Sequence, residues 1–525
     1  MLNVVLQNFI YGNPTRLELI DYQKKNKGIH KKISIYRNHS FELVEHTITP
    51  YLDFAGYDVD FVYSDYDDSL SFFNLDPESD LLILWLDITR YSSQNVSEFI
   101  QSRLEYLGKI YKKNVLLALL GDCSVKTDFV DFPINKVAKQ LGEKFWDEKR
   151  ETFTGTRISS KGMLQISKEI GLNYIPSLLS APLKAIVVDL DNTLYSGVLG
   201  EDGCNGIKIN EGHLYLQNVL LELKKQGVLL AIASKNEASD VERMFKENTN
   251  FAIKYEDFSK VCVNWENKSS SISEIANFFN IGQDAILFVD DNPGELVEVD
   301  SVLPEVKKLL ANENGVLTAE ILKNYPGIKR YNIHFEDSIR DSDIRANEKR
   351  RELQTQMSQS EYIKSLHMNL TYCVDDEKSM QRISELANKT NQFIFAYRRY
   401  SLSQVKDLMD GDDSAVVSVS LKDDLSDSGI IGVFVGKKHK NVLLLDECFV
   451  SCRALGRGID EVLVKQGIQI LMDVLKTEKL QISFIDGERN MPARRFVDEY
   501  LKEYVDSSKD WHFKDEEKLV EITIK

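Results

Sequence analysis

Two carboxylates, one residue apart, form the group with the clearest chemical potential. Asp189 and Asp191 follow a short apolar run at residues 185–188. Such a run is typical of a buried parallel strand, and open α/β sheets place their ligand sites at the carboxyl ends of strands. Two aspartates there can hold a hard cation such as Mg²⁺, and one of them can attack phosphorus to form an aspartyl-phosphate. The alternative is a simple turn or helix cap.

Three later segments carry the other polar groups that phosphoryl transfer needs. Ser234 ends a second apolar strand, and Lys268 stands just before a predicted helix. Asp290 and Asp291 end a third apolar strand. Asp290 can share a metal ion with Asp189, while the hydroxyl and the ammonium group bind the phosphoryl oxygens on which charge gathers. A cap explains any one of these residues, but the ordered series favours phosphotransfer.

The spacing of these groups leaves little room for a lid. Asp191 is suited to protonate the leaving oxygen and later to deprotonate the hydrolytic water. Between Asp191 and Ser234 there is room for a flap at 195–210, one helix and one strand, and between Lys268 and Asp290 for one helix. The site must therefore exclude water with another domain or with a large substrate.

Alternating strands and helices must position these side chains. A chain of 525 residues is too long for one hydrophobic core, and we expect three domains of the α/β class. The predicted divisions are a helical lead-in at 1–31, an α/β domain at 32–180, a second α/β domain at 181–335, a charged helical connector at 336–359 and a third domain at 360–525. In the second domain we predict strands at 185–190, 228–233 and 285–289 and helices at 212–226, 237–247 and 271–279.

The composition of the chain indicates which partners and which cellular compartment to expect. The 65 basic and 82 acidic residues give a net charge of −17, which argues against nucleic-acid and anionic-membrane partners. The six cysteines show no paired or zinc-binding spacing, as expected of reduced thiols in a cytoplasmic protein. We find no signal peptide, and no apolar run is long enough to span a bilayer.

Residues 189–203 and 288–293 resemble the haloacid-dehalogenase (HAD) superfamily of aspartate-nucleophile phosphatases, and in particular its FkbH-like branch, subfamily IIIC. The resemblance implies a capless Rossmannoid core in which Asp189 is the nucleophile and Asp191 the acid/base. The phosphate-binding residues assigned with it are Thr193, Ser234, Lys268 and Asn292. The Mg²⁺ ligands assigned with it are Asp189, Asp191, Asp290 and Asp291.

A glycine-rich turn before a long predicted helix at 459–477 forms a second anion-binding motif. Its glycines let backbone N–H groups approach an anion, and the helix N-terminus adds partial positive charge; tight helix packing is the alternative. The segment resembles the pyrophosphate loop of GNAT acyltransferases, which implies a GNAT-like α+β domain that binds the phosphopantetheine arm of coenzyme A or of a carrier protein. The arm-binding residues so implied are Arg453, Gly456, Arg457 and Gly458.

Segments 388–393, 398–401, 427–429 and 451–458 resemble the same FkbH-like family, in which a GNAT-like module follows the phosphatase. Its members take the glyceryl group of 1,3-bisphosphoglycerate, release phosphate and load an acyl carrier protein, with an enzyme cysteine holding the acyl group in transit. Cys452 is the candidate because it adjoins the anion loop, ahead of Cys448 and Cys204, although single cysteines are usually small buried residues. The possible substrate contacts are Asn391, Gln392, Arg398 and Arg399, although arginine pairs commonly lie on the surface.

The family's leading α/β domain resembles SGNH hydrolases, whose late motif supplies a catalytic Asp and His. Segment 154–162 has threonine and arginine at those places, and Ser40 follows the first strand without the usual Gly-Asp. A serine without its base is inert at neutral pH, so we expect a non-hydrolytic domain that serves as a lid or docks a carrier. His39 and His46 are expected to be structural.

These inferences lead to three hypotheses. The first is a Mg²⁺-dependent phosphatase and acyltransferase that dephosphorylates a phosphoglyceryl-type metabolite and loads the glyceryl or a related hydroxyacyl unit onto an acyl carrier protein. The second is a phosphatase acting on another phosphorylated metabolite or carrier-bound group, whose GNAT-like domain acylates an amine from acyl-coenzyme A. The third is a non-catalytic scaffold that docks carrier proteins.

Overall fold

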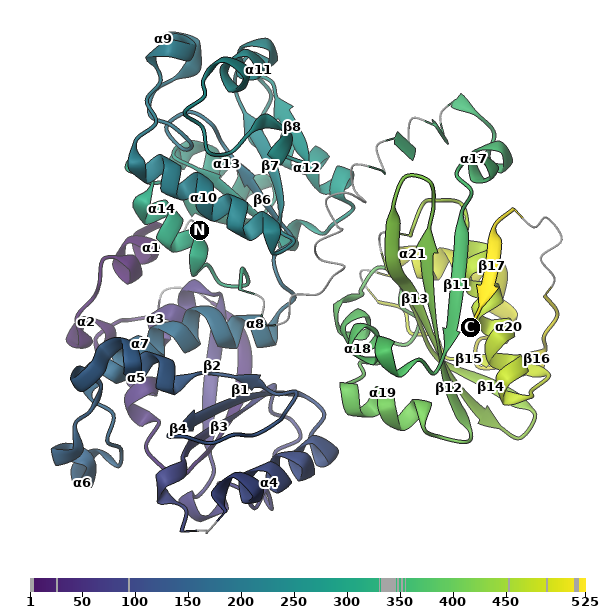
Figure 1. The fold of residues 1–525 in the computed structure, drawn as a ribbon, viewed down its shortest axis with the longest axis horizontal. Helices are drawn as coiled ribbons and strands as arrows, with labels where there is room; N and C mark the ends of the chain where they lie inside the picture. Colours follow the sequence, from purple (N-terminus) through teal and green to yellow (C-terminus); the bar gives the residue numbers. More distant parts are fainter. Residues whose placement is uncertain are drawn as a thin grey trace. The chain divides into compact units, whose positions relative to one another are not determined.

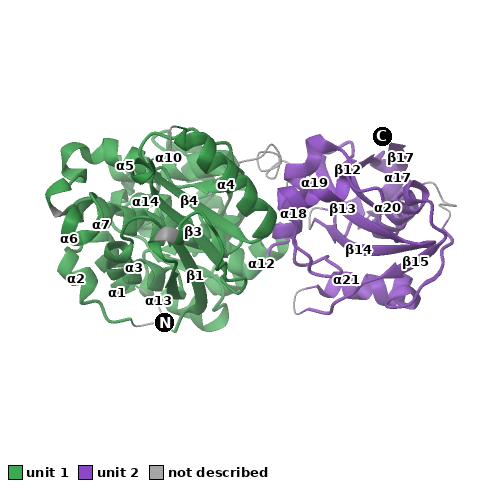
Figure 2. Ribbon diagram, turned by 90° about the horizontal axis from the view of Figure 1, so that it is seen from below, with its two compact units in different colours: residues 1–278, 282–333 green, residues 279–281, 334–525 purple. Residues whose placement is uncertain are grey.

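The computed structural model describes residues 4–24, 27–92, 95–329, 331, 346, 349–350, 353–354, 356–451, 454–487, 490–513 and 519–525. The chain forms two compact units, Met1–Phe278 with Gly282–Ile333, and Phe279–Ile281 with His334–Lys525 (Figures 1 and 2). The boundary expected at residues 180–181 lies inside the first unit, between its two sheets. Most of the expected connector at 336–359 lies outside the described residues. No helix in the described part of the chain is long and apolar enough to cross a membrane.

The first unit begins with a parallel five-stranded sheet in the order β2-β1-β3-β4-β5. Its strands are β1 (Ile29–Arg37), β2 (Tyr57–Tyr63), β3 (Leu81–Asp87), β4 (Asn114–Leu120) and β5 (Val130–Asp131). The main helices around it are α3 (Glu42–Phe54), α4 (Val96–Ile110), α5 (Ile134–Leu141), α7 (Ser160–Glu169) and α8 (Ile175–Leu179). Every residue of β3 is buried, as expected of a central parallel strand covered by helices on both faces.

The second sheet of this unit is also parallel and has the order β10-β9-β6-β7-β8. Its strands are β6 (Ala185–Val188), β7 (Leu229–Ser234), β8 (Lys260–Val263), β9 (Ile286–Asp290) and β10 (Lys307–Leu310). The helices are α9 (Leu199–Gly206), α10 (Glu211–Lys225), α11 (Ala238–Glu247), α12 (Lys268–Phe279), α13 (Pro293–Val302) and α14 (Val316–Lys323). Because β6 lies between β7 and β9, the three predicted strand ends meet at one edge of the sheet.

Three local expectations for this sheet need correction. The strand predicted at 185–190 ends at Val188, so both aspartates of the first motif lie in the following loop. Lys268 does not precede its helix but is the first residue of α12. Edge strands β8 and β10 were not predicted, because each has only four residues and begins with lysine, which weakens the apolar signal.

Helix α1 (Val4–Tyr11) packs against the second sheet, although the first sheet follows it in sequence (Figure 1). Leu6 and Ile10 belong to the same buried cluster as Leu309 of β10. The Gln7 amide donates to the carbonyl oxygen of Leu310 at 2.9 Å and accepts from its N–H at 3.2 Å. One side chain thus satisfies backbone groups at the edge of the sheet. The predicted lead-in also includes the short helix α2 (Arg16–Ile20).

The second unit contains a mixed seven-stranded sheet in the order β16-β15-β14-β13-β12-β11-β17. Its strands are β11 (Asn369–Val374), β12 (Ser414–Lys422), β13 (Asp427–His439), β14 (Val442–Val450), β15 (Lys479–Ile482), β16 (Lys509–Asp510) and β17 (Glu521–Ile524). The helices are α17 (Gln359–Ser365), α18 (Met380–Lys389), α19 (Leu402–Met409), α20 (Asp460–Leu475) and α21 (Met491–Phe496). Strands β11 to β14 are antiparallel to one another, and β14 pairs in parallel with β15.

Candidate active site

Three carboxylates meet at the carboxyl edge of the second sheet. Asp189 follows β6, Asp290 ends β9, and Asp291 follows it. One oxygen from each lies within 4.8 Å of the other two. Asp290 is fully buried and Asp189 nearly so, which keeps water from screening their mutual repulsion. The group therefore carries more negative charge than its surroundings tolerate without a cation.

Lys268 supplies part of the missing positive charge. Its Nζ atom donates to Asp189 Oδ1 at 2.5 Å and to the Ala233 carbonyl oxygen at 2.6 Å, and it lies 3.2 Å from Asp290 Oδ2. Burial disfavours the ammonium form, but Asp189 and Asp290 outweigh it and raise the pKa of Lys268. The lysine therefore stays charged and fixes the orientation of the Asp189 carboxylate.

One lysine does not neutralise three carboxylates. Burial, followed by repulsion from Asp189, raises the pKa of Asp290 to about 7. The same two causes raise the pKa of Asp291 to about 6. Three carboxylate oxygens close enough to share one ion are the hard ligands that Mg²⁺ prefers. Asp189, Asp290 and Asp291 therefore fit the expected Mg²⁺ site. The side chain of Asp191, also assigned to the metal, is engaged in other contacts.

Asp191 is held by three donors from three places in the chain. Its Oδ1 atom accepts from the Tyr195 hydroxyl at 2.5 Å and from the Leu199 N–H at 3.0 Å. Its Oδ2 atom accepts from Asn236 Nδ2 at 3.0 Å. Asn192 enables the tight loop by adopting φ of +50°, and its side chain accepts from the Gly197 N–H at 2.9 Å. The acid/base candidate is thus oriented before any substrate arrives.

The predicted phosphate contacts lie around the same edge. Ser234 is buried at the end of β7, and its Oγ atom accepts from Asn236 Nδ2 at 3.1 Å. The Oγ1 atom of Thr193 is buried without a hydrogen-bond partner among the described residues, as a group awaiting a ligand would be. The side chain of Asn292 instead caps α13, because its Oδ1 atom accepts from the Gly294 N–H at 2.8 Å.

Two side chains of this site were not predicted. Tyr195 stands in the expected flap and is fully buried, and Asn236 follows Ser234 by two residues. Both contact Asp191, and Asn236 links it to Ser234. The sequence contained one indication that Asn236 belongs to the site: it lies just after a strand end, where polar side chains of an α/β sheet gather.

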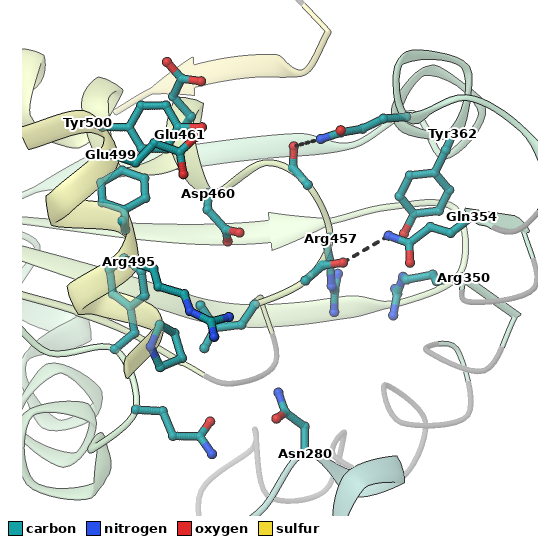
Figure 3. A pocket seen from close by; sticks show the side chains of 18 residues that line it. Asn280, Arg350, Gln354, Tyr362, Arg457, Asp460, Glu461, Arg495, Glu499 and Tyr500 are labelled. Carbon is teal, nitrogen blue, oxygen red and sulfur yellow. Dashed lines mark hydrogen bonds between the residues drawn. The ribbon is translucent and has the colours of Figure 1, made fainter. Parts of the chain in front are cut away.

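The second unit has a cavity of about 710 Å³ beside the predicted anion loop (Figure 3). Gly456 and Gly458 line it with φ of +79° and +77°, and a Cβ on Gly456 would meet no atom within 4 Å. Arg457 also lines it, but its buried guanidinium pairs with Asp423 at 3.3 Å and donates to Ser428 at 2.8 Å. The carbonyl oxygens of Gly456 and Gly458 accept from Gln354 Nε2 at 3.0 Å and from Gln359 Nε2 at 3.2 Å, so a ligand would have to be bound by the N–H groups of the loop.

Carboxylates also face this cavity. Asp460 and Glu461 form the first turn of α20, and Glu499 and Arg495 also line the cavity (Figure 3). Burial raises the pKa of Asp460 to about 6. The cavity is large enough for a phosphopantetheine arm. Its carboxylates offset the partial positive charge of the helix N-terminus and oppose a ligand with several phosphates.

Of the four residues predicted to contact the substrate, one lines the cavity and three do not. Gln392 lines the cavity. Arg399 instead donates to the carbonyl oxygen of Thr390 at 2.8 Å and to Asn391 Oδ1 at 2.7 Å, which ties the loop to itself. Arg398 pairs with Asp446 at 3.1 Å. Neither arginine nor Asn391 is among the described residues that line the cavity.

Of the three cysteines considered as holders of the acyl group, the structure describes Cys448 and Cys204. Cys452 and Arg453 lie outside the described residues. Cys448 is fully buried in β14, where burial and then Glu447 raise the pKa of its thiol well above the usual value. A thiol in that position is not a nucleophile at neutral pH. Cys204 is half-buried in α9 of the first unit.

The first sheet has no serine–histidine pair at the expected position. Ser40 Oγ donates to Glu42 Oε2 at 2.7 Å. His39 is buried, stacks on Trp85 with ring centroids 4.9 Å apart, and contacts Thr156 Oγ1 at 3.1 Å. Burial, followed by nearby arginines, holds the pKa of His39 well below its usual range. Arg157, at the expected place of the missing histidine, pairs with Asp87 at 2.9 Å.

No protein-family model matches the chain, and no curated protein does. Among solved structures, it is similar to the N-terminal part of a Bacteroides fragilis protein containing a phosphatase domain complexed with Mg, with 19% identity, a TM-score of 0.46, and coverage of 61% of this chain and 99% of that one. It is also similar to a HAD family enzyme from Bacteroides thetaiotaomicron in complex with magnesium and inorganic phosphate, with 14% identity, a TM-score of 0.17, and coverage of 44% and 93%. An acetyltransferase of the GNAT family from Streptococcus pneumoniae matches with 12% identity, a TM-score of 0.20, and coverage of 25% and 83%. With TM-scores this low, none of these likenesses defines the fold or the activity of this chain.

Proposed function

We propose that the first unit is a Mg²⁺-dependent phosphatase whose nucleophile is Asp189. The observation that carries this proposal is the group of three carboxylates at adjacent strand ends, with one oxygen of each within 4.8 Å of the others, and the contact of Lys268 with two of them, Asp189 and Asp290. Asp290 and Asp291 would hold Mg²⁺ together with Asp189. The bound ion would screen the negative charge of an approaching phosphate.

The chemistry follows from the contacts. The free oxygen of the Asp189 carboxylate attacks phosphorus while the bond to the leaving oxygen breaks, and Asp191 donates a proton to that oxygen. A water molecule then attacks the aspartyl-phosphate, Asp191 takes its proton, and inorganic phosphate leaves with Asp189 restored. Lys268 and the hydroxyls of Ser234 and Thr193 bind the phosphoryl oxygens throughout.

The second unit completes the proposal as an acyltransferase. The substrate is a phosphoglyceryl-type metabolite such as 1,3-bisphosphoglycerate, whose phosphate ester is hydrolysed at Asp189. A thiolate attacks the carbonyl carbon of its acyl phosphate, the bond to the phosphate oxygen breaks, and inorganic phosphate leaves as the thioester forms. The final acceptor is the phosphopantetheine thiol of an acyl carrier protein. The carboxylates at 460 and 461 support a carrier over coenzyme A, because a carrier's arm brings one phosphodiester whereas coenzyme A also brings a pyrophosphate and a further phosphate. Cys452 remains the proposed holder of the acyl group.

The test combines 1,3-bisphosphoglycerate, a panel of carrier proteins and Mg²⁺, followed by phosphate assay and intact-mass analysis. We expect phosphate release and a glyceryl mass gain on a carrier. Asp189→Asn should abolish release of the ester phosphate and the glyceryl mass gain, so that any mass gain on a carrier is that of a phosphoglyceryl unit. The partly exposed control Asp240→Asn should match the unchanged chain. Phosphate release without acylation would refute the carrier-loading step alone. Release of the ester phosphate that survives Asp189→Asn would refute the nucleophile.

A further inference from the structure

The first unit contains a cavity of about 340 Å³, separate from the cavity of the second unit described above. None of the residues proposed for phosphoryl transfer lines it. Its walls come from α5 and α7, from the π-helical turn at Ile170–Tyr174, and from the end of α14 together with Lys329. Elements that flank both parallel sheets therefore contribute to it. The volume falls at the lower end of the range of small-molecule sites.

Three lysines line this cavity without a counter-charge in contact. Lys168 and Lys329 are partly buried and Lys136 is exposed. Burial lowers the pKa of Lys168. Burial also lowers the pKa of Lys329, with Glu169 acting against it and Lys136 adding to it. Within the described ranges, none of the three ammonium groups makes a hydrogen bond or an ion pair; Lys168 lies 5.2 Å from the centroid of the Tyr11 ring. Holding partly desolvated cations together without a counter-ion is costly.

The two carboxylates of the cavity are engaged with other groups. Glu169 accepts from Gln165 Nε2 at 2.9 Å, and Glu320 accepts from the Tyr215 hydroxyl at 2.5 Å. Both lie near enough to raise the pKa of Lys168, yet they do not outweigh its burial. The lining thus holds three cationic and two anionic side chains, and among the described residues only the cations make neither a hydrogen bond nor an ion pair.

The side-chain amide of Asn173, which also lines the cavity, offers a hydrogen-bonding group to a ligand. Asn173 is 2% exposed, and its Oδ1 atom has no hydrogen-bond partner in the described part of the chain. Its Nδ2 atom makes one long contact with Asn324 Oδ1, at 3.5 Å. A buried amide oxygen left in this state favours a ligand that brings a hydroxyl donor.

We infer that this cavity binds a small hydrophilic anion, in which a carboxylate or phosphate group meets Lys168 and Lys329 and a hydroxyl group meets Asn173. The two lysines would bind the anionic group of the ligand, and Asn173 would bind its hydroxyl group. The lining is mostly polar and therefore suits a hydrophilic ligand better than an apolar one. Because the phosphotransfer residues are elsewhere, this is a second ligand site of the unit.

The probes are tartrate, a hydroxylated dicarboxylate, and glycerol 2-phosphate, each titrated calorimetrically into the full chain with EDTA present so that no phosphate is transferred. We expect at least one of them to bind. Lys168→Met with Lys329→Met should weaken that binding by about tenfold or more, and the exposed control Lys161→Met on the same helix should not change it. The probe that binds identifies the anionic group.

Thermal unfolding gives a second readout. Without a probe, we expect the double variant to melt at or above the temperature of the unchanged chain, because it loses two partly desolvated charges; lysines that serve only the fold would have the opposite effect. The rate of phosphate release with Mg²⁺ should stay the same. Absence of binding by both probes, or equal binding by the double variant, would overturn the inference. If that variant does not fold, Lys329→Gln alone provides the test.

Discussion

Tyr195 illustrates how one side chain can set the position of the proposed acid/base, Asp191. It is fully buried, and its hydroxyl donates to the same Asp191 oxygen as the Leu199 N–H. For Tyr195→Phe we expect kcat to fall by about 10- to 100-fold, the usual effect of losing a supporting hydrogen bond. KM should change little, since the hydroxyl serves Asp191 and not the substrate. Steady-state kinetics separate the two constants.

The control for this change is Tyr255→Phe, at a partly exposed position near the same sheet. It should leave both constants unchanged. A Tyr195→Phe enzyme with unchanged kcat would mean that the Leu199 N–H and Asn236 suffice to orient Asp191.

The raised pKa values of Asp290 and Asp291, about 7 and about 6, lead to a pH-dependent effect of Mg²⁺. Between pH ~4 and 7 the folded metal-free protein holds protons that the unfolded chain has released, so its free energy of unfolding falls as the pH rises through this window. Mg²⁺ requires ionised ligands. We therefore expect Mg²⁺ to raise the melting temperature clearly at pH 8 and little at pH 5.5.

Differential scanning calorimetry at the two pH values, with Mg²⁺ or EDTA, measures this difference. Asp291→Asn should reduce the Mg²⁺ effect at pH 8. Equal stabilisation by Mg²⁺ at both pH values would contradict the assignment of these carboxylates as its ligands.

At the residue scale, the sequence predicts groups that stand at strand ends better than those that reach them from loops. Asp189, Ser234 and Asp290 come together because parallel neighbouring strands bring their carboxyl ends to one edge. Tyr195 and Asn236 depend on how two loops fold toward Asp191, which no periodicity encodes. Asn292 was assigned to phosphate but is used as a helix cap, a role equally common for asparagine after a strand.

At the element scale, Glu447 holds the segment that crosses beside β14. Strands β14 and β15 pair only as far as Leu445 and Ile482, and beyond that point residues 393–395 lie against β14, where the Phe395 N–H donates to the Cys448 carbonyl oxygen at 3.0 Å. The buried carboxylate of Glu447 accepts from four backbone N–H groups, those of Phe395, Ala396, Arg398 and Cys448. It thus fixes the loop that carries the predicted substrate contacts.

We expect Glu447→Gln to lower the free energy of unfolding of the second unit by about 2 kcal/mol, because an amide replaces charge-assisted acceptors and turns its own N–H groups toward other donors. Urea denaturation followed by tryptophan fluorescence measures the change. Glu521→Gln, at an exposed position of β17, is the control. Equal stability of the two variants would show that water replaces the lost contacts.

Strands of the second sheet could be predicted from the sequence where a long run of apolar residues marked them. Strands β6, β7 and β9 stand close to their predicted positions, because their residues are nearly all apolar and buried on both faces. The four-residue strands β8 and β10 gain their ordered state from pairing with β7 and β9. Such pairing is a tertiary contribution that single-sequence patterns do not contain.

At the scale of the whole molecule, helix α1 packs against the second sheet of the first unit. We expect Gln7→Ala to lower the melting temperature of the first unit by several degrees, as the loss of two hydrogen bonds at a buried sheet edge costs about 1–3 kcal/mol. Asn8→Ala, at the exposed neighbouring position, should have no effect. Calorimetry compares them, and matching melting temperatures would contradict a stabilising role for Gln7.

The expected division at residues 180–181 illustrates what the sequence does not contain at this scale. Composition and element order separate two α/β patterns correctly, but they do not reveal that α1 belongs to the later one. The contact between Gln7 and Leu310 joins residues 303 positions apart. Only the folded chain shows that the two sheets form one compact unit.

That long-range contact has a consequence for synthesis on the ribosome. Domains generally fold as they emerge, but α1 waits for a partner that is made some 303 residues later. At 5–20 residues per second, the delay is roughly 15–60 s. During this time the apolar face that contains Leu6 and Ile10 has no sheet to cover it, and it is exposed to chaperones and to other nascent chains. The second sheet is complete only when α1 docks on β10, the last strand of the unit.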